Sequence, residues 1–495
     1  MRICFFLSVY EIFFQRISEV LREAIPAPEF TGIAYGKLGP IRLRQTRTKW
    51  GEIAVFTDYL REQGMDKPFD LSFLQEKDRE LGIPNINFYI SADRYISKLK
   101  YEDAMRSLEL CIRFVEEALE RQKPDLIIMD DVCCMLSYLI YQIGKKRGLP
   151  VWSLGSLKIN HRLSIYDDCL DRRDKVENAY QELKKLPLTF EEKKLAEDYL
   201  HQYTHHYEPL LYLKTRSKVP DLSLKMLTEW LRLSLHHLKD PLDVTRMSFG
   251  ELARSRVFRV VRHYAGKVSG LFEKPVAGEK YVFFPLQVQP ERSTLILAPF
   301  HCDQLALIEN ISKSLPVGYR LYVKDHPIFL GRRPLGEYQR LKKIYNVRLL
   351  DASLPSFEIV KNASLVMTIS NTIGIEAIFL ERPLIVMGDT FYRHYDNALY
   401  VDQVKQLPEK IKTLIDTFKP DREDLLRFIN ALFKGSYPGT RRQPNAVPYV
   451  VSRENVRDVS AALLEEMGLV FGEKFKLSPL KQPALSSSDS TPLRF

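Results

Sequence analysis

Two stretches of this chain alternate short apolar runs with segments of helical periodicity, and this alternation limits the fold more than any other feature. In the first stretch, apolar residues recur at helical spacing over residues 101–121, and the apolar run 125–129 follows Pro124. A helix to Lys146 and another apolar run, 151–154, complete a strand–helix–strand unit. Parallel strands joined by crossover helices produce this pattern. We therefore expect a parallel sheet that begins with a strand over residues 2–9.

The same pattern returns in the second half of the chain. Residues 170–270, in between, lack a strand pattern and favour long charged helices, such as 189–207 and 222–238. In the second half we expect strands over residues 281–284, 320–323, 347–350, 364–369 and 383–387. The predicted organisation is an α/β domain at 1–170, a helical insert at 171–275, a second α/β domain at 276–440, a C-terminal helix packing back at 441–477 and a disordered tail at 478–495.

Composition excludes several classes of protein. Hydrophobic residues make up 45% of the 495 residues, which is enough for large buried cores. Six cysteines without a C-x-x-C pair argue against a disulfide scaffold and indicate reduced thiols in a cytoplasmic setting. No apolar run reaches the roughly 18 residues that a membrane-spanning helix needs. Lysine and arginine number 73 against 63 acidic residues, and the resulting net charge of +10 favours anionic partners.

The familiar phosphate-binding motifs are missing from the sequence. None of the 22 glycines is followed by another glycine two positions later, so the chain has no G-x-G-x-x-G loop. It has no P-loop motif either. It also lacks the D-x-D pair that holds a divalent cation in many sugar transferases. Any nucleotide site should therefore work without a metal, and no cofactor is predicted.

Two further clusters allow alternative interpretations. Glu197, His201 and His205 share one predicted helix face and could ligate zinc, but a solvated charged helix commonly has the same spacing. The basic run from Arg254 to Lys267 is interleaved with apolar residues. This run fits a contact with a membrane surface or an acceptor phosphate, and it also fits an ordinary amphipathic helix.

One unusual cluster follows the predicted strand 320–323. The strand runs into Lys324-Asp325-His326-Pro327. Proline ends the strand and holds His326 in an extended geometry, where its imidazole can donate to a phosphate while Lys324 adds a positive charge. The alternative is a strand-end turn with a surface histidine.

A second cluster follows the predicted strand 364–369, where the chain turns directly into a helix. Ser370, Asn371 and Thr372 lie at the amino terminus of this helix, where free backbone N–H groups and the helix dipole attract anions. Gly374 would let the backbone approach a ligand, and Glu376 could accept a hydrogen bond from a ribose hydroxyl. The alternative is a plain helix cap with Glu376 facing solvent.

Between Tyr281 and Tyr392, the chain resembles the capsule polysaccharide biosynthesis proteins, whose characterised members are GT-B sugar transferases related to the bacterial Kdo transferases. The matching motifs are Phe284-Pro-Leu-Gln287, Gln289-Pro-Glu291, Asp303 to Asn310, Leu315-Pro-Val-Gly318, Val323-Lys-Asp-His-Pro327, Thr372-Ile-Gly374 with Glu376-Ala377, Arg382-Pro383, and Gly388 with Phe391-Tyr392. Where the family usually has glutamate and glycine, this chain has Asp325 and Asn371.

The resemblance implies a GT-B-like α/β fold, with two Rossmann-type parallel-sheet domains facing a cleft. A nucleotide-sugar donor, such as a CMP-linked acidic sugar, would bind the second domain, and a glycan or glycolipid acceptor would enter from the first. His326 would stabilise the leaving phosphate, and Asp130, Asp131 or Glu291 would activate the acceptor hydroxyl. Asp130 or Asp131 could instead cap the following helix. The expected donor contacts are Gln289, Lys324, His326, Pro327, Ser370, Asn371, Thr372, Gly374 and Glu376.

The main hypothesis is a cytoplasmic, metal-independent glycosyltransferase of capsule or surface polysaccharide biosynthesis, in peripheral contact with the cytoplasmic face of the inner membrane. A polyol phosphotransferase of teichoic-acid type with a CDP-activated donor is an alternative, because it shares the fold and the anion-binding turns. A non-catalytic homologue that acts as a polysaccharide assembly partner is another. A nucleic-acid partner is not expected, because the charge is spread over helices of mixed sign without a recognisable reader motif.

Overall fold

The structure is a computed structural model. It describes residues 1–44, 49–82, 85–157, 159, 161–207, 240–244, 249–329, 331–442 and 447–478, together with the single positions 228, 231, 235, 238, 444 and 480. The predicted helix over 222–238 and the predicted tail over 478–495 therefore lie almost entirely outside the described residues.

The first sheet has seven strands in the order β13-β6-β5-β4-β1-β2-β3. Its parallel part consists of β1 (Arg2–Leu7), β2 (Glu29–Ala34), β3 (Ile53–Val55), β4 (Leu126–Met129) and β5 (Val151–Ser156). Two antiparallel strands, β6 (Arg162–Tyr166) and β13 (Tyr437–Pro438), extend one edge. The central strand β4 is buried at every position, as expected for a sheet covered on both faces.

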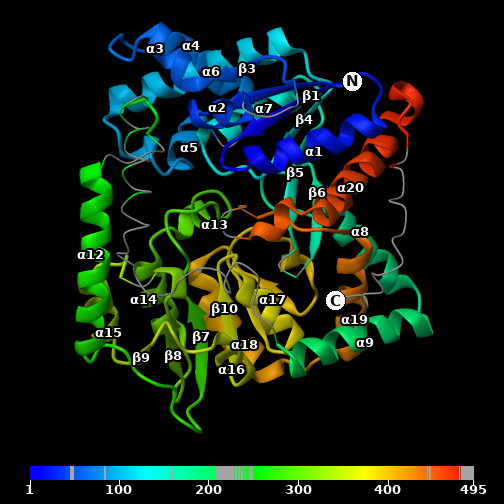
Figure 1. Ribbon diagram of the computed structural model, residues 1–495. Helices are drawn as coiled ribbons and strands as arrows, with labels where there is room; N and C mark the ends of the chain where they lie inside the picture. Colours follow the sequence, from blue (N-terminus) through cyan, green and yellow to red (C-terminus); the bar gives the residue numbers. More distant parts are fainter. Residues whose placement is uncertain are drawn as a thin grey trace.

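The second sheet is entirely parallel, in the order β12-β11-β10-β7-β8-β9. Its strands are β7 (Tyr281–Pro285), β8 (Arg320–Lys324), β9 (Val347–Leu350), β10 (Leu365–Thr368), β11 (Leu384–Val386) and β12 (Ala398–Tyr400). The predicted α/β fold with two parallel-sheet domains is confirmed, and Figure 1 shows the two domains stacked one above the other.

Helices cover both sheets. Those of the first domain are α1 (Glu11–Ala24), α2 (Leu38–Arg44), α3 (Phe56–Gln63), α4 (Leu71–Leu81), α5 (Ile86–Ser91), α6 (Tyr101–Gln122) and α7 (Met135–Lys146). Those of the second are α13 (Arg292–Leu295), α14 (Gln304–Ser314), α15 (Leu335–Lys342), α16 (Ser356–Lys361), α17 (Thr372–Phe379) and α18 (Leu407–Thr417). No helix in the described part of the chain is long and apolar enough to cross a bilayer.

The segment between the domains is helical where it is described, with α8 (Asp174–Lys185), α9 (Phe190–His205) and α12 (Phe249–Val268). The predicted helix over 189–207 is confirmed as α9, which begins at Thr189 with a capping box that Glu192 completes. Both α8 and α9 pack against α19 (Arg422–Lys434), which follows the second sheet.

The end of the chain returns to the first domain. Strand β13 pairs with β6, and α20 (Arg453–Phe471) packs against α1, as the orange helix beside the blue domain in Figure 1 shows. The first sheet is therefore built from both ends of the sequence. Strands β6 and β13 were not predicted, because runs of five and two residues are too short for an apolar periodicity to stand out in the sequence.

Candidate functional site

Three adjacent strands of the second sheet end in polar residues at one edge. Strands β10, β7 and β8 are neighbours, and they run into Ser370, Gln287 and His326, respectively. The carboxyl ends of parallel strands share one edge of a sheet, so the two predicted clusters lie on the same edge, on either side of the β7 end.

His326 has a defined donor and acceptor side. Its Nδ1 accepts the backbone N–H of Ile328 at 3.1 Å, so the hydrogen of the neutral ring is on Nε2. The loop around it is held by Asp325, which is 1% exposed and accepts from Arg333 Nε at 3.0 Å and from the Tyr338 hydroxyl at 2.5 Å. Asp325 thus fixes the backbone of the loop, while half-buried Pro327 starts a short 3₁₀ helix, Pro327–Phe329.

The turn from β10 into α17 is already hydrogen-bonded. Asn371 caps α17, because its Oδ1 accepts the Ile373 N–H at 2.8 Å. When the Gln287 amide is oriented with its oxygen toward the turn, that oxygen accepts from Ser370 N at 3.0 Å and Asn371 N at 3.2 Å. The sequence suggested that the N–H groups of this turn are free, but the Gln287 oxygen already accepts from two of them. An incoming anion therefore has to take the place of this oxygen.

Gly374 is needed for a reason other than the one predicted. A Cβ at this position would lie 2.5 Å from the Tyr392 ring, so Tyr392 and not a ligand occupies the space beside the glycine. The Tyr392 hydroxyl in turn donates to the carbonyl of Asn371. Tyr392 therefore supports the turn from behind, and half-buried Thr372 is the first residue of the helix.

Glu376 does not face solvent, which contradicts the alternative interpretation of this residue. Its side chain is 7% exposed, its Oε1 accepts from the Tyr207 hydroxyl at 3.4 Å, and its Oε2 has no hydrogen-bond partner in the part of the chain that the structure describes. Burial raises the pKa of Glu376 to about 7, although the nearby Lys324 charge opposes this shift. Lys324 is itself buried and donates to Ser356 Oγ at 2.9 Å.

The corresponding edge of the first sheet is dominated by ion pairs. Asp131 follows β4 and contacts the side chains of Arg441 and Tyr166, and Arg292 Nε lies 3.9 Å from its carboxylate. Burial alone would raise the pKa of Asp131, but the three arginines Arg441, Arg292 and Arg173 lower it to about 2. Asp131 is thus ionised and already bound by its neighbours. It is therefore suited to holding the local structure in place and not to accepting a proton.

Its neighbour Asp130 is in a different environment. Asp130 is 4% exposed, and Ser8 Oγ lies 3.5 Å from its Oδ1. Burial raises the pKa of Asp130 to about 6. The positive charge of Arg441 lowers this pKa, but the negative charge of Asp131 raises it again and burial outweighs the arginine. A carboxylate with a pKa this close to neutral is suited to general base catalysis.

Arg173 was missed by sequence reasoning. Its guanidinium is buried, stacks 3.5 Å from the Tyr166 ring centre and pairs with Asp171, yet its Nε and Nη1 have no hydrogen-bond partner among the described residues. A Cβ on Gly155 would collide with this guanidinium at 2.2 Å, so the glycine makes room for it. Only the three-dimensional fold brings Arg173 and Arg441 to the end of β4, and no local motif marks either one.

Arg292 joins the two domains. It donates to the carbonyl of Val132 at 3.0 Å and of Cys169 at 3.1 Å, and it lies 3.5 Å from Asp171. The carbonyl of the next residue, Ser293, accepts from Ser370 Oγ at 3.0 Å. The carboxyl edge of the first sheet is therefore linked to the α17 turn through one short helix, α13.

Two more predicted residues lie next to α13. Glu291 is the exposed residue just before this helix. Gln289 is half-buried, and its Oε1 accepts from Gln304 Nε2 at 2.9 Å. Gln304 also bonds the backbone of Gln287, so these amides form one network beneath the predicted donor site.

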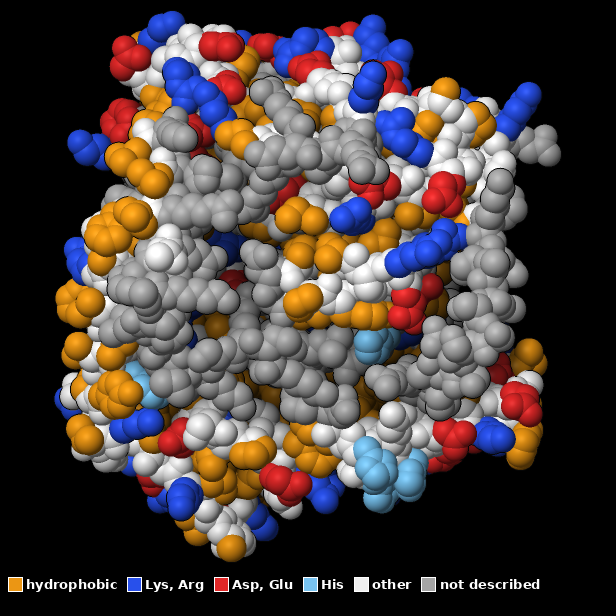
Figure 2. Space-filling view, in the orientation of Figure 1, with side chains coloured by type: hydrophobic (Ala, Val, Ile, Leu, Met, Phe, Trp, Pro, Cys, Tyr) orange, Lys and Arg blue, Asp and Glu red, His pale blue; other side chains and the backbone are white. Residues whose placement is uncertain are grey.

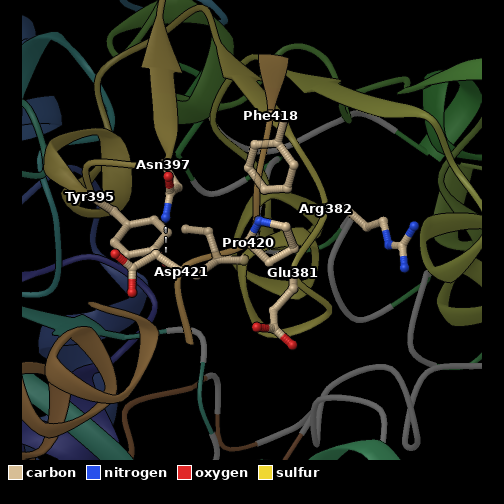
Figure 3. Close-up of a pocket in the computed structure, with 8 residues that line it drawn as sticks. Glu381, Arg382, Tyr395, Asn397, Phe418, Pro420 and Asp421 are labelled. Atoms are coloured by element: carbon tan, nitrogen blue, oxygen red, sulfur yellow. Dashed lines mark hydrogen bonds between the residues drawn. The ribbon is translucent and has the colours of Figure 1, made fainter. Parts of the chain in front are cut away.

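Two other features lie away from this region. Glu197 pairs with Arg422, and among the described residues no group of three or more His, Cys, Asp or Glu side chains could hold a metal. A small pocket lies beyond the carboxyl-terminal end of α17, on the other side from the Asn371 cap; Figure 3 shows Glu381, Arg382, Tyr395 and Asn397 around it. Neither feature includes a predicted site residue.

Parts of this chain are similar in sequence to known proteins. Residues 258–409 match the model of the family described as "Capsule polysaccharide biosynthesis protein". Protein FixF of Sinorhizobium fredii is 27% identical over 169 residues, which are 32% of this chain and 39% of that protein. The capsule polysaccharide export protein KpsS of Escherichia coli is 32% identical over 146 residues, which are 28% of this chain and 34% of that protein. The matches thus span well under half of these two relatives.

Among solved structures, a β-Kdo 2,4 transferase, KpsC of Thermosulfurimonas dismutans, aligns with a TM-score of 0.37 at 13% identity, covering 66% of this chain and 88% of that one. The family match spans β8, β10, α17 and the residues around His326 and Glu376. Residues 258–409 of this chain are therefore similar to the capsule polysaccharide biosynthesis proteins.

Proposed function

We propose that the protein is a metal-independent glycosyltransferase that uses a nucleotide-activated sugar to build a capsule or another surface polysaccharide. The observation that carries this proposal is the convergence of His326, Gln287 and Ser370 on three adjacent strand ends, within the part of the chain that matches the family. Ligands of open α/β sheets bind at such edges. The protein would act in the cytoplasm, in peripheral contact with a membrane.

The donor would bind at the edge of the second sheet. Nε2 of His326 would donate to a phosphate oxygen, and the phosphate would take the place of the Gln287 oxygen at the α17 turn. Glu376 would accept from a ribose hydroxyl through its unpartnered Oε2. Lys324 would add positive charge, so these groups together would supply the charge stabilisation that a metal provides in other transferases. A CMP-linked acidic sugar is the donor that we favour.

The acceptor would bind at the edge of the first sheet, where we assign the role of general base to Asp130. Its pKa of about 6 allows it to be ionised at neutral pH and still accept a proton in the reaction. Asp131 is a poor candidate because its proton affinity is too low, at a pKa of about 2. Glu291 is exposed beside the interdomain helix and is the alternative base.

A transferase assay with purified wild type and His326→Ala tests the role of the histidine. Loss of the phosphate contact should lower the rate by roughly ten- to a hundredfold, in line with one hydrogen bond to a charged group. Asp325→Asn is the companion variant, because it removes loop support without touching the donor. Undiminished transfer by correctly folded His326→Ala would remove His326 from the site.

Calorimetric titration with CMP, CDP, UDP and GDP separates the donor classes. Binding of CMP supports the sugar transferase, whereas binding of CDP with polyol transfer supports a polyol phosphotransferase of teichoic-acid type. If none of the four binds, neither enzyme class stands, and a role as a non-catalytic assembly partner is favoured. The buried base Asp130 favours the enzymatic functions over that last alternative.

A further inference from the structure

Helix α12 has an inverted distribution of side chains. Its buried residues are Arg259, His263 and Gly266, all on one face. The opposite face carries Val257, Val261, Tyr264 and Val268 at intervals of four, three and four residues, and these side chains are 55%, 56%, 55% and 87% exposed. We call these four residues the outer stripe. An ordinary amphipathic surface helix would bury such residues, so in the part of the chain that the structure describes this sequence pattern does not serve packing.

Cationic side chains flank the outer stripe. Between Phe249 and Val268 there are five arginine and lysine residues, of which Arg259 is buried on the inner face, and one acidic residue, Glu251. Arg262 lies 5.5 Å from the ring centre of Phe258 and Lys267 lies 5.7 Å from that of Tyr264, so both cations lie beside exposed aromatic rings. In the space-filling view, hydrophobic side chains gather along the edge of the molecule where α12 lies (Figure 2).

The inner face of α12 holds the loop that carries His326. Arg259 Nη2 bonds the carbonyl of Ile328 at 3.4 Å, and Arg262 Nη1 bonds that of Arg332 at 2.9 Å. The Ile328 N–H is the group that bonds His326 Nδ1. Whatever contacts the outer stripe is therefore separated by the width of α12 from the loop that carries His326.

We propose that α12 is an interfacial helix that docks the protein on a membrane surface rich in anionic lipids. An exposed apolar stripe with aromatic side chains and flanking cations has the chemistry of helices that lie in the headgroup region, with the apolar face in the acyl boundary and the cations at lipid phosphates. Charge complementarity favours this occupant over a second copy of this chain, because two copies of α12 would bring the same excess of cations together at the contact. Docking would hold the donor site at a fixed height above the bilayer.

Vesicle co-sedimentation of the full chain tests this proposal. One set of vesicles contains phosphatidylcholine alone, and in the other about a third of the lipid is phosphatidylglycerol. Wild type should sediment with the anionic vesicles and not with the neutral ones. The double substitution Val257→Asp/Val261→Asp should lower the partition coefficient roughly tenfold or more. Its matched control is Val276→Asp/Val317→Asp, which adds the same charges at two other exposed valines and should bind like wild type.

A charge reversal tests the electrostatic part. Arg254→Glu should weaken binding to anionic vesicles roughly fivefold or more, whereas Lys193→Glu on α9 should not. Thermal melts should be unchanged in all variants, because every substituted side chain is exposed.

Three results would overturn the proposal. In the first, wild type does not sediment with either kind of vesicle. In the second, wild type and the outer-stripe double variant bind equally well. In the third, wild type binds no vesicles but is a dimer in solution, and the double variant is a monomer. The last result would make the stripe a contact between two copies of this chain. None of these measurements depends on transferase activity.

Discussion

The carboxyl edges of the two sheets occupy equivalent places in the fold but differ in their electrostatics. At the first edge, Asp130, Asp131 and Asp171 lie among three arginines, and most of these side chains are buried. At the second edge, amides and hydroxyls predominate: Gln287, Gln304, Ser370 and Asn371 bond one another or the backbone. Glu376, Lys324 and the Asp325–Arg333 pair are the buried charged groups described at this second edge.

The difference in electrostatics between the two edges fits a different task for each edge, namely proton transfer at the first and anion binding at the second. Ion pairs in a low dielectric fix geometry and separate the proton affinities of neighbouring carboxylates, as the pKa values of about 6 and about 2 for Asp130 and Asp131 illustrate. Neutral amides can exchange a partner for a ligand at low cost. The first edge is therefore built to hold a reactive group, and the second to admit an anion. The following predictions break or sharpen this comparison.

The largest effect is expected from Asp131→Asn. The substitution leaves buried Arg441 and half-buried Arg292 with one anion fewer, and removing one partner of a buried pair typically costs about 3–5 kcal/mol of the free energy of unfolding. Urea denaturation of both proteins measures the difference. The control is Glu197→Gln, which breaks the half-exposed pair with Arg422 and should cost about 1 kcal/mol or less. Equal losses in the two variants would refute the view that the first edge is an electrostatic anchor.

The pH dependence of stability should distinguish the two adjacent aspartates. The folded-state pKa of Asp130 is raised from 3.8 to about 6, so the folded chain holds this proton more tightly than the unfolded chain, and stability falls as pH rises from about 4 to about 6. Relative to wild type, Asp130→Asn should gain up to about 3 kcal/mol across this range. Asp131 acts in the opposite sense: its pKa is lowered to about 2, so its contribution is complete above 3.8 and is lost as pH falls toward 2.

Urea melts of wild type and Asp130→Asn at several pH values measure this difference. A constant difference between the two proteins from about pH 4 to 7 would mean that Asp130 titrates normally. In a transferase assay, the same variant should lose at least about a hundredfold in rate, because an amide cannot take the acceptor proton. The wild-type rate should also decline below about pH 6.

How far the sequence predicts the molecule depends on the range of the interactions. Helix α14 and the strands β7, β8 and β9 follow from local periodicity, and the His326 and Ser370 clusters follow from polar residues placed where strands end. Arg173 and Arg441 could not be found in this way. They are 268 positions apart, and Arg441 contacts Asp131 only because the last part of the chain returns to the first sheet.

The role of Gly374 shows the same limit. A glycine one turn into a helix suggested close approach by a ligand, yet the neighbour is Tyr392, contributed by a later segment. Likewise, the apolar pattern of α12 predicts a helix but not which face is buried. Local patterns specify the elements, whereas side-chain partners depend on tertiary packing.

Gly374→Ala should destabilise the turn at the second edge by about 1–3 kcal/mol, because the new methyl group overlaps the Tyr392 ring. Removing the ring should remove the clash, so Gly374→Ala in a Tyr392→Leu background should cost about 0.5 kcal/mol or less. Thermal or urea denaturation of the four proteins of this cycle measures the coupling. Additive effects would show that Gly374 is required by something other than Tyr392. The Leu380→Ala variant, at the other end of α17, controls for a general loosening of this helix.

The smallest effect concerns Glu376 and tests whether the second edge has a titrating group of its own. Its pKa is raised to about 7 by burial, so at pH 6 the side chain is mostly neutral and at pH 8 mostly ionised. A carboxylate accepts a ribose hydroxyl better than a carboxylic acid does, so affinity for the bound nucleotide should rise by about two- to tenfold between these values in wild type. Glu376→Gln should abolish this rise, because an amide keeps an acceptor oxygen but does not titrate. Subtracting the profile of the variant from that of wild type removes the titration of His326 and of the nucleotide phosphate, which both proteins share. Identical profiles would mean that Glu376 does not contact the nucleotide, and its unpartnered Oε2 would then be a purely structural feature of the core beneath the second edge.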